Sequence, residues 1–212
     1  MDERSSLFVE GADDLHALSH LLRRRGVTDG TPGFPKIEHK DGWQGVLQTI
    51  EIRIRFGTER RLGFVLDADG APEDRWRRIE RALQNTGLNP PETLPAEGYV
   101  DFCEPFGTHV GVWLMPDNRR RGAIEEFLLD LVRPNDPLLE HAARATAQAS
   151  TIGATFPETA RRKAELRAWL AWQESPGLPY GSAMAADYLD SGHPAAIPFV
   201  DWFSRLFGLD AG

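Results

Sequence analysis

Short apolar runs alternate with amphipathic segments through most of the first 134 residues. Residues 6–9, 62–66 and 110–115 are apolar runs bounded by polar residues, a pattern typical of buried strands. Residues 34–38 form a weaker candidate strand. Because the apolar positions between these runs recur at helical spacing, the pattern predicts a chain in which strands and helices alternate.

Four helices are predicted between and after these strands. Their apolar positions run from Leu15 to near Gly26, from Trp43 to Gly57, from Trp76 to near Gly87, and over residues 122–132. A proline-rich loop is expected at 89–98. Beyond it the pattern changes: residues 137–172 are predicted to be helical throughout. A loop rich in proline and glycine follows, and a terminal helix is predicted over 195–207.

This alternation predicts an α/β fold with a mostly parallel central sheet and helices on both faces. Residues 1–134 are predicted to form the α/β domain, and residues 135–212 a helical extension packed on the same domain. No apolar run approaches the roughly 20 residues that cross a bilayer, so no membrane association is expected. The single cysteine, Cys103, excludes an internal disulfide and favours a cytoplasmic protein.

The charge of the chain narrows the function classes. With 32 acidic and 24 basic residues the formal net charge is −8, which argues against a protein that coats nucleic acid by bulk attraction. An enzyme that meets nucleic acid at one local patch remains compatible with this charge. The sequence leaves a homo-oligomer open.

Three carboxylates follow the ends of predicted strands. Glu10 follows the first, and Asp67 and Asp69 follow the clearest buried strand, with Gly70 allowing a sharp turn. Because ligands in such folds bind outside the carboxyl ends of the strands, these side chains are expected at one edge of the sheet. Gathered carboxylates repel each other without a cation, and oxygen ligands suit Mg²⁺ or Mn²⁺. Taken alone, Asp67-Ala68-Asp69-Gly70 is equally typical of a strand end with a helix cap.

The stretches Phe8-Val9-Glu10-Gly11-Ala12-Asp13-Asp14 and Gly63-Phe64-Val65-Leu66-Asp67-Ala68-Asp69 together resemble the Toprim domain. Topoisomerases, bacterial primases, recombination proteins and nucleases of the overcoming-lysogenization-defect type share this domain. The resemblance covers roughly residues 1–130. Within the superfamily, residues 113–118, 122–128 and 163–173 resemble a small uncharacterised bacterial group of the DUF3226 type.

The resemblance implies a role for each matching residue. Glu10 would act as general acid/base or metal ligand, Asp67 and Asp69 would bind metal, and Lys163 would lie near the scissile phosphate. Further acidic positions that match nuclease-type members are Asp14, Asp117 and Glu125. With two ions, Glu10, Asp14 and Asp67 would hold one, and Asp69, Asp117 and Glu125 the other; a single ion is the simpler expectation.

The leading hypothesis is therefore a Mg²⁺- or Mn²⁺-dependent nuclease that cuts DNA or RNA, as the effector of a bacterial defence or toxin system. Nuclease relatives with a fused ATPase imply that a separate ATPase partner serves this chain. The main alternative is a catalytically silent Toprim-fold protein that binds or regulates a partner. A third interpretation, a haloacid-dehalogenase-type phosphatase, is disfavoured because its motif normally follows the first strand. His16 and His20 have a zinc-compatible spacing but no evident third ligand, so a structural role is expected for them.

Overall fold

The computed structural model describes residues 4–209. Five strands form one sheet in the order β2-β1-β3-β5-β4. They are β1 (Ser5–Val9), β2 (Lys36–His39), β3 (Arg61–Asp67), β4 (Tyr99–Cys103) and β5 (Thr108–Met115). The pairs β1–β2, β1–β3 and β3–β5 are parallel, and only β4 runs antiparallel to its neighbour β5. The predicted α/β class with a mostly parallel sheet is confirmed.

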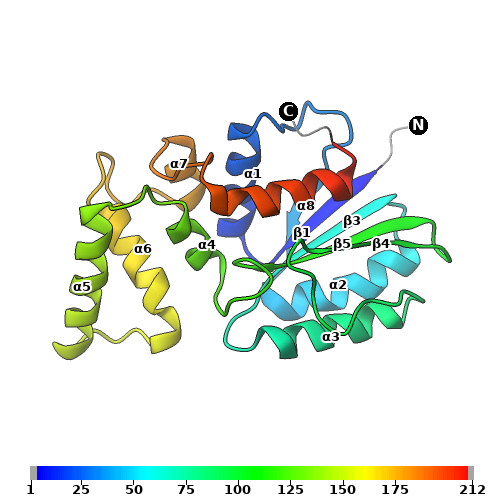
Figure 1. The fold of residues 1–212 in the computed structure, drawn as a ribbon, viewed down its shortest axis with the longest axis horizontal. Coiled ribbons are helices and arrows are strands. Elements are labelled where there is room, and N and C mark those ends of the chain that lie inside the picture. Colours follow the sequence, from blue (N-terminus) through cyan, green and yellow to red (C-terminus); the bar gives the residue numbers. More distant parts are fainter. Residues whose placement is uncertain (1–3, 210–212) are drawn as a thin grey trace.

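Helices cover both faces of this sheet (Figure 1). On one face lie α2 (Gly42–Phe56) and α3 (Pro72–Gln84), and on the other lie α1 (Ala12–Arg24) and the last helix, α8 (Ile197–Phe207). Alternate residues of each strand feed the two cores, so Phe8 packs with α2 and α3 while Leu7 and Val9 pack with α1 and α8. Such strands read as continuous apolar runs because both faces are buried.

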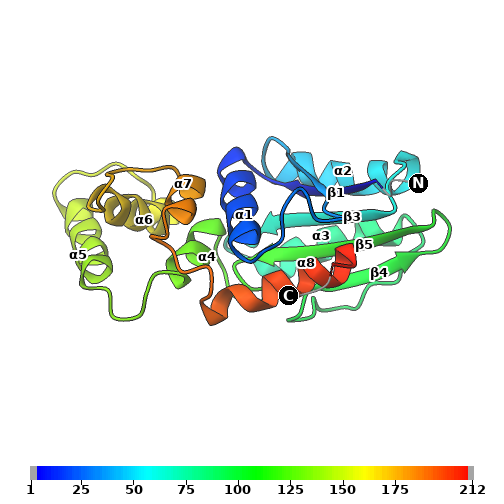
Figure 2. The ribbon, with the colours of Figure 1, turned by 90° about the horizontal axis from the view of Figure 1, so that it is seen from above.

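The remaining helices lie beside one end of the sheet (Figure 2). They are α4 (Ile124–Asp130), α5 (Pro137–Thr151), α6 (Arg161–Ala171) and α7 (Tyr180–Ala185). α7 packs along α1, and α6 packs between α5 and α4. The chain then returns to the sheet through α8, so the predicted helical extension contributes both to the side group and to the cover of the sheet. None of the helices in residues 4–209 has the length and apolar character needed to cross a membrane.

A glycine pair explains how α8 reaches the sheet. Gly63 and Gly111 are partners across β3 and β5, and a Cβ added at either would come within 2.6 Å of a neighbouring side chain. For Gly111 that side chain is Leu206 of α8, and for Gly63 it is Leu7, with Leu206 at 3.1 Å. The absence of side chains at Gly63 and Gly111 therefore leaves room for the terminal helix to pack on the sheet.

Two local predictions were wrong, and one strand has no counterpart among the predicted elements. Strand β4 was not predicted, because Asp101 and the exposed Phe102 interrupt its apolar pattern. α7 lies in a segment predicted as loop, because Pro179 and Gly181 resemble helix breakers; Pro179 instead precedes the helix as its N-cap. Residues 137–172 are not helical throughout, since α5 ends at Thr151 and the chain turns at Gly153 before α6.

Candidate functional site

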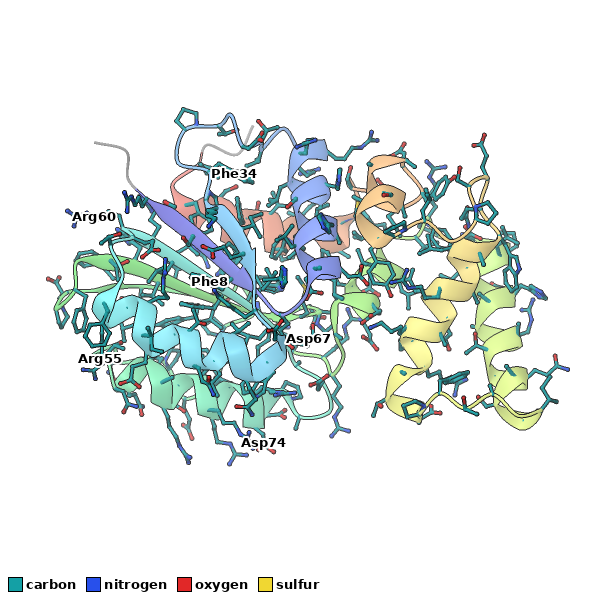
Figure 3. All side chains as sticks on the ribbon, turned by 180° about the vertical axis from the view of Figure 1, so that it is seen from behind. Phe8, Phe34, Arg55, Arg60, Asp67 and Asp74 are labelled. Atoms are coloured by element: carbon teal, nitrogen blue, oxygen red, sulfur yellow. The ribbon has the colours of Figure 1, made fainter. Side chains whose placement is uncertain are left out.

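The carboxyl ends of β1 and β3 bring the first two predicted carboxylates together. Glu10 follows β1, Asp67 is the last residue of β3, and the two strands are adjacent and parallel. The Asp67 backbone N–H donates to Oε1 of Glu10 at 2.8 Å. Figure 3 shows Asp67 at the end of the sheet that faces the side group of helices.

Backbone N–H groups at the starts of two helices bind the carboxylates of Asp14 and Asp67. Asp14 lies in the first turn of α1, where its Oδ2 accepts the Gly11 backbone N–H at 2.6 Å. The backbone N–H of Ile124, at the start of α4, donates to Oδ1 of Asp67 at 3.1 Å. Free N–H groups at a helix start favour a carboxylate, so these contacts fix the side chains in place.

Glu125 completes the group from the start of α4. It is buried, with 6% of its surface exposed, and the Nζ atom of Lys163 on α6 lies 2.9 Å from its Oε1. The hydroxyl of Tyr180 on α7 donates to the same oxygen at 3.2 Å. Residues far apart in the sequence thus meet at one acidic side chain.

These side chains line one cavity of about 530 Å³ between the sheet edge and α6. Its charged lining residues are Glu10, Asp13, Asp14, Asp67, Glu125 and Lys163. A second cavity of about 560 Å³ shares Glu125 and Lys163 with the first and continues past Arg121, Arg162 and Asp69. Lys163 therefore lines both cavities. Carboxylates dominate the first, whereas in the second Arg121 and Arg162 lie beside the further carboxylates of Asp69, Glu126 and Glu158.

Burial and mutual repulsion shift the pKa values of the clustered acids. Burial raises the pKa of Glu10 to about 7, against the hydrogen bond from Asp67, and the nearby charges of Asp14 and Asp69 add to the rise. Burial likewise raises the pKa of Asp14 to about 6, with Glu125 adding repulsion. The pKa of Asp67 is held well above its usual range by burial and then by Glu10. The cluster thus lacks enough positive charge to keep all of its members ionised.

Lys163 is the cation that faces this cluster. Its hydrogen bond to Glu125 raises the pKa of the ammonium, against the effect of burial. One ammonium set against the four carboxylates of Glu10, Asp14, Asp67 and Glu125 leaves an excess of negative charge in the cavity. Such an excess favours binding of a further cation.

Two predicted ligands lie elsewhere. Asp69 adopts a left-handed backbone with φ of 50°, its side chain is exposed, and it forms an ion pair with Arg75. Its backbone pairs with Gly122 through bonds of 2.7 and 2.8 Å, which tie the turn after β3 to the segment before α4. Asp117 accepts a hydrogen bond from Arg120 Nε at 2.6 Å. Burial alone would raise the pKa of Asp117, but hydrogen bonds from Arg120 and from the Arg119 backbone bring it below its usual range.

The donor set matches oxygen-seeking cations in its chemistry. Within residues 4–209, no three His, Cys, Asp or Glu side chains are placed so as to hold one metal ion as they stand. Each clustered carboxylate instead gives one oxygen to a protein donor: Asp67 N, Gly11 N, Ile124 N or Lys163. Carboxylates of this kind suit Mg²⁺ or Mn²⁺, which bind through one or two carboxylates and keep several waters. A cation shared by three of them would require side-chain rotations.

Sequence reasoning missed the contributions of α6 and α7 around Lys163. Arg167 pairs with Asp13 at 2.8 Å and lies over the ring of Tyr180, 4.2 Å from its centroid. Tyr180 itself is fully buried against the site. No local signal marked it, because its segment reads as a loop and its partner Glu125 precedes it by 55 residues.

Comparison with known proteins gives one family. A family model described as "Protein of unknown function (DUF3226)" matches residues 4–208, which is nearly the whole chain. No curated protein and no solved structure matches the chain.

Proposed function

The chain belongs to the DUF3226 family, whose function is unknown, and we propose that it is a divalent-metal-dependent phosphodiester hydrolase of the Toprim type. One observation carries the proposal: Glu10, Asp14, Asp67 and Glu125 line a single cavity at the carboxyl edge of the sheet, with Lys163 at its border. The resemblance of residues 8–14 and 63–69 to Toprim motifs supports the same assignment.

Asp14 and Asp67 would hold one Mg²⁺ or Mn²⁺ ion beside Glu10. Their raised pKa values are a cost that a cation relieves, because a positive charge restores the ionised form of each acid. When bound, the ion supplies an activated water and a positive charge for a phosphate oxygen. A second ion at Asp69, Asp117 and Glu125 has less support, because Asp69 and Asp117 are already paired with arginines.

Glu10 and Lys163 are the residues suited to proton transfer and substrate binding. Burial raises the pKa of Glu10 to about 7 in the metal-free protein, and a carboxylate whose pKa lies near the working pH is an effective general base. Glu10 would take this role in place of binding the ion, which Asp14 and Asp67 would then hold. Its carboxylate would accept the proton of the attacking water. Lys163 would donate a hydrogen bond to a non-bridging oxygen of the phosphodiester, because it lines both cavities.

DNA or RNA is the proposed substrate, in keeping with Arg121 and Arg162 in the cavity next to Lys163. The net charge of −8 opposes tight binding of a polyanion by the whole surface, so contact would be confined to this region. A separate ATPase partner and a place in a bacterial defence or toxin system follow from the Toprim resemblance alone.

A second candidate function is a silent binding protein that keeps this fold. The observation in its favour is that Glu125, Asp69 and Asp117 each already have an internal cation, namely Lys163, Arg75 and Arg120. With these three carboxylates compensated internally, the remaining acids could bind a metal or a partner without turnover.

Purified protein should be tested against supercoiled plasmid, single-stranded DNA and RNA with Mg²⁺ or Mn²⁺. We expect cleavage that needs the metal and is lost in Glu10→Ala and in Asp67→Ala. Glu140→Gln is the matched control, because Glu140 is an exposed carboxylate on α5 that pairs with Arg144 and lines neither cavity. No cleavage of any substrate, together with Mn²⁺ binding that Asp67→Ala abolishes, would favour the silent binding protein.

A further inference from the structure

Tyr180 reaches the acidic cluster from a helix far along the chain. Its side chain is fully buried, and its hydroxyl donates to Oε1 of Glu125 at 3.2 Å. The same oxygen lies 2.9 Å from Nζ of Lys163. One atom of Glu125 therefore receives a donor from α7 and a donor from α6 at the same time.

The local sequence explains why Tyr180 sits there. α7 begins at Tyr180 and continues with Gly181, which packs against α1. A Cβ at Gly181 would lie 2.7 Å from Cβ of His16 and 2.9 Å from its backbone, so only glycine permits this approach. The close contact of α7 with α1 brings the adjacent Tyr180 to Glu125, which lines the same cavity as the start of α1.

A second contact holds the ring of Tyr180. The Arg167 guanidinium lies 4.2 Å from the ring centroid, and its Nη2 is 2.8 Å from Oδ2 of Asp13. Asp13 lines the cavity together with Asp14. The ring is thus fixed between α1 and α6, and the hydroxyl has little freedom to leave Glu125.

We infer that Tyr180 is a positioning residue for this site: its hydroxyl fixes Glu125, and Glu125 in turn sets the place of the Lys163 ammonium. The inference deepens the proposed function and rests on it for the catalytic consequence. Without the hydroxyl, Glu125 would be free to rotate about its side-chain bonds, and Lys163 would follow. Because Glu125 is not among the ligands of the single proposed ion, loss of the hydroxyl should affect the contact of Lys163 with the phosphate rather than the affinity for the metal.

The chain offers a direct measurement of Lys163, because it contains only three lysines, Lys36, Lys40 and Lys163. Lysine-selective ¹³C labelling of the full-length protein therefore gives three Cε signals by NMR. Tyr180→Phe keeps the buried ring and removes only the hydroxyl. The matched control is Tyr188→Phe, because the Tyr188 hydroxyl accepts the Ser175 backbone N–H at 2.8 Å in the same group of helices, away from the cluster.

In Tyr180→Phe we expect the Lys163 signal to move while the Lys36 and Lys40 signals stay. We also expect the KM for the nucleic acid to rise while the affinity for Mn²⁺, measured by calorimetry, stays unchanged, because Glu125 is not a ligand of the single proposed ion. Tyr188→Phe should change neither the Lys163 signal nor the KM. Glu125→Gln should move the Lys163 signal as well, because a neutral amide holds an ammonium weakly, and it serves as the test if Tyr180→Phe does not fold.

An unchanged Lys163 signal in Tyr180→Phe would overturn the inference, as would equal shifts in both tyrosine variants. If the wild-type protein neither binds Mn²⁺ nor cuts nucleic acid, the proposed function fails. The Lys163 signal then still decides whether Tyr180 positions Glu125 and Lys163.

Discussion

Each end of β3 carries a carboxylate, buried at Glu59 and half-buried at Asp67, and the two differ in how their charge is compensated. Glu59, two residues before the strand begins, is buried and forms an ion pair with Arg53 of α2. Its side chain also accepts the Thr58 backbone N–H at 2.9 Å and the Ser6 hydroxyl at 3.4 Å. Gly57 makes room for this arrangement, since a Cβ there would lie 2.4 Å from Oε2 of Glu59.

Asp67, at the other end of the same strand, has no such cation among residues 4–209. It shares its surroundings with Glu10, Asp14 and Glu125, and the nearby Lys163 pairs with Glu125. Figure 3 marks the two ends of the strand by Arg60 and Asp67.

This difference distinguishes a carboxylate that is buried as part of a structural ion pair from carboxylates that are gathered at a functional site. A buried carboxylate with its own guanidinium is compensated within the fold, so no ligand is needed there. Carboxylates that raise one another's pKa destabilise the fold unless something binds, and such clusters are typical of functional sites. The amino end of β3 is therefore a structural ion pair, and the carboxyl end is the candidate site.

The largest expected effect comes from exchanging one carboxylate at each end. Glu10→Gln should lower metal-dependent cleavage by about 10²- to 10⁴-fold, because the amide cannot accept the proton of the attacking water. Glu59→Gln should leave the cleavage rate of the folded protein unchanged. Plasmid cleavage at saturating Mg²⁺ measures both. Equal losses of cleavage rate in Glu10→Gln and Glu59→Gln would show that the two ends of β3 do not differ in function.

The free energy of unfolding should depend on Glu59 and not on Glu10, which is the reverse of the expectation for the cleavage rate. Glu59→Ala should lower the free energy of unfolding by about 3 kcal/mol, because Arg53 would be left partly buried without a counter-charge. Urea unfolding at pH 7 measures this change. Glu10→Gln should not destabilise the protein above pH 7 without metal, because it removes a repulsive charge. A loss of stability in Glu10→Gln as large as that in Glu59→Ala would assign a structural role to Glu10.

The pH dependence of stability should sharpen the comparison. Glu10 has a pKa of about 7 in the folded protein and an ordinary value near 4.5 when unfolded, so the folded state binds the proton more tightly. Stability is therefore highest below about pH 4.5 for this group and is lost as the pH rises to about 7, by roughly 3 kcal/mol. Urea unfolding at pH 5, 6, 7 and 8 without metal measures the slope.

Glu10→Gln should flatten this slope, and Mg²⁺ should restore stability at pH 8, because a ligand that binds only the folded state stabilises it. A Mg²⁺ effect of equal size in Asp67→Asn would place the ion outside the cluster.

The smallest effect is expected at Asp117. Because it is half-exposed and paired with Arg120, Asp117→Asn should change the free energy of unfolding by less than about 1 kcal/mol. Cleavage should also stay near the wild-type rate if a single ion binds at Asp14 and Asp67. Parallel unfolding and plasmid assays measure the two quantities. A large loss of cleavage without loss of stability would bring Asp117 into the site and support a second ion.

The local pattern of hydrophobic and polar residues is enough to predict much of the fold. The apolar runs that became β1, β3 and β5 are buried on both faces of a parallel sheet, so their hydrophobicity does not depend on knowing their neighbours. Strand β4 and helix α7 were missed for the converse reason. One is an edge strand with exposed positions, and the other is a short helix whose Gly181 has meaning only against His16.

The candidate site likewise has features that the sequence determines and features that only the tertiary structure decides. Sequence determined that Glu10 and Asp67 would meet, because parallel strands end at one edge of a sheet, and the structure brings them to 2.8 Å between Oε1 and the backbone nitrogen. Only the tertiary structure decided that Asp69 turns outward to Arg75 and that Tyr180 points inward to Glu125. The positions of the strands along the chain follow from the local hydrophobic pattern. Their order in the sheet, and the partner of a side chain after a turn, depend on how distant segments pack.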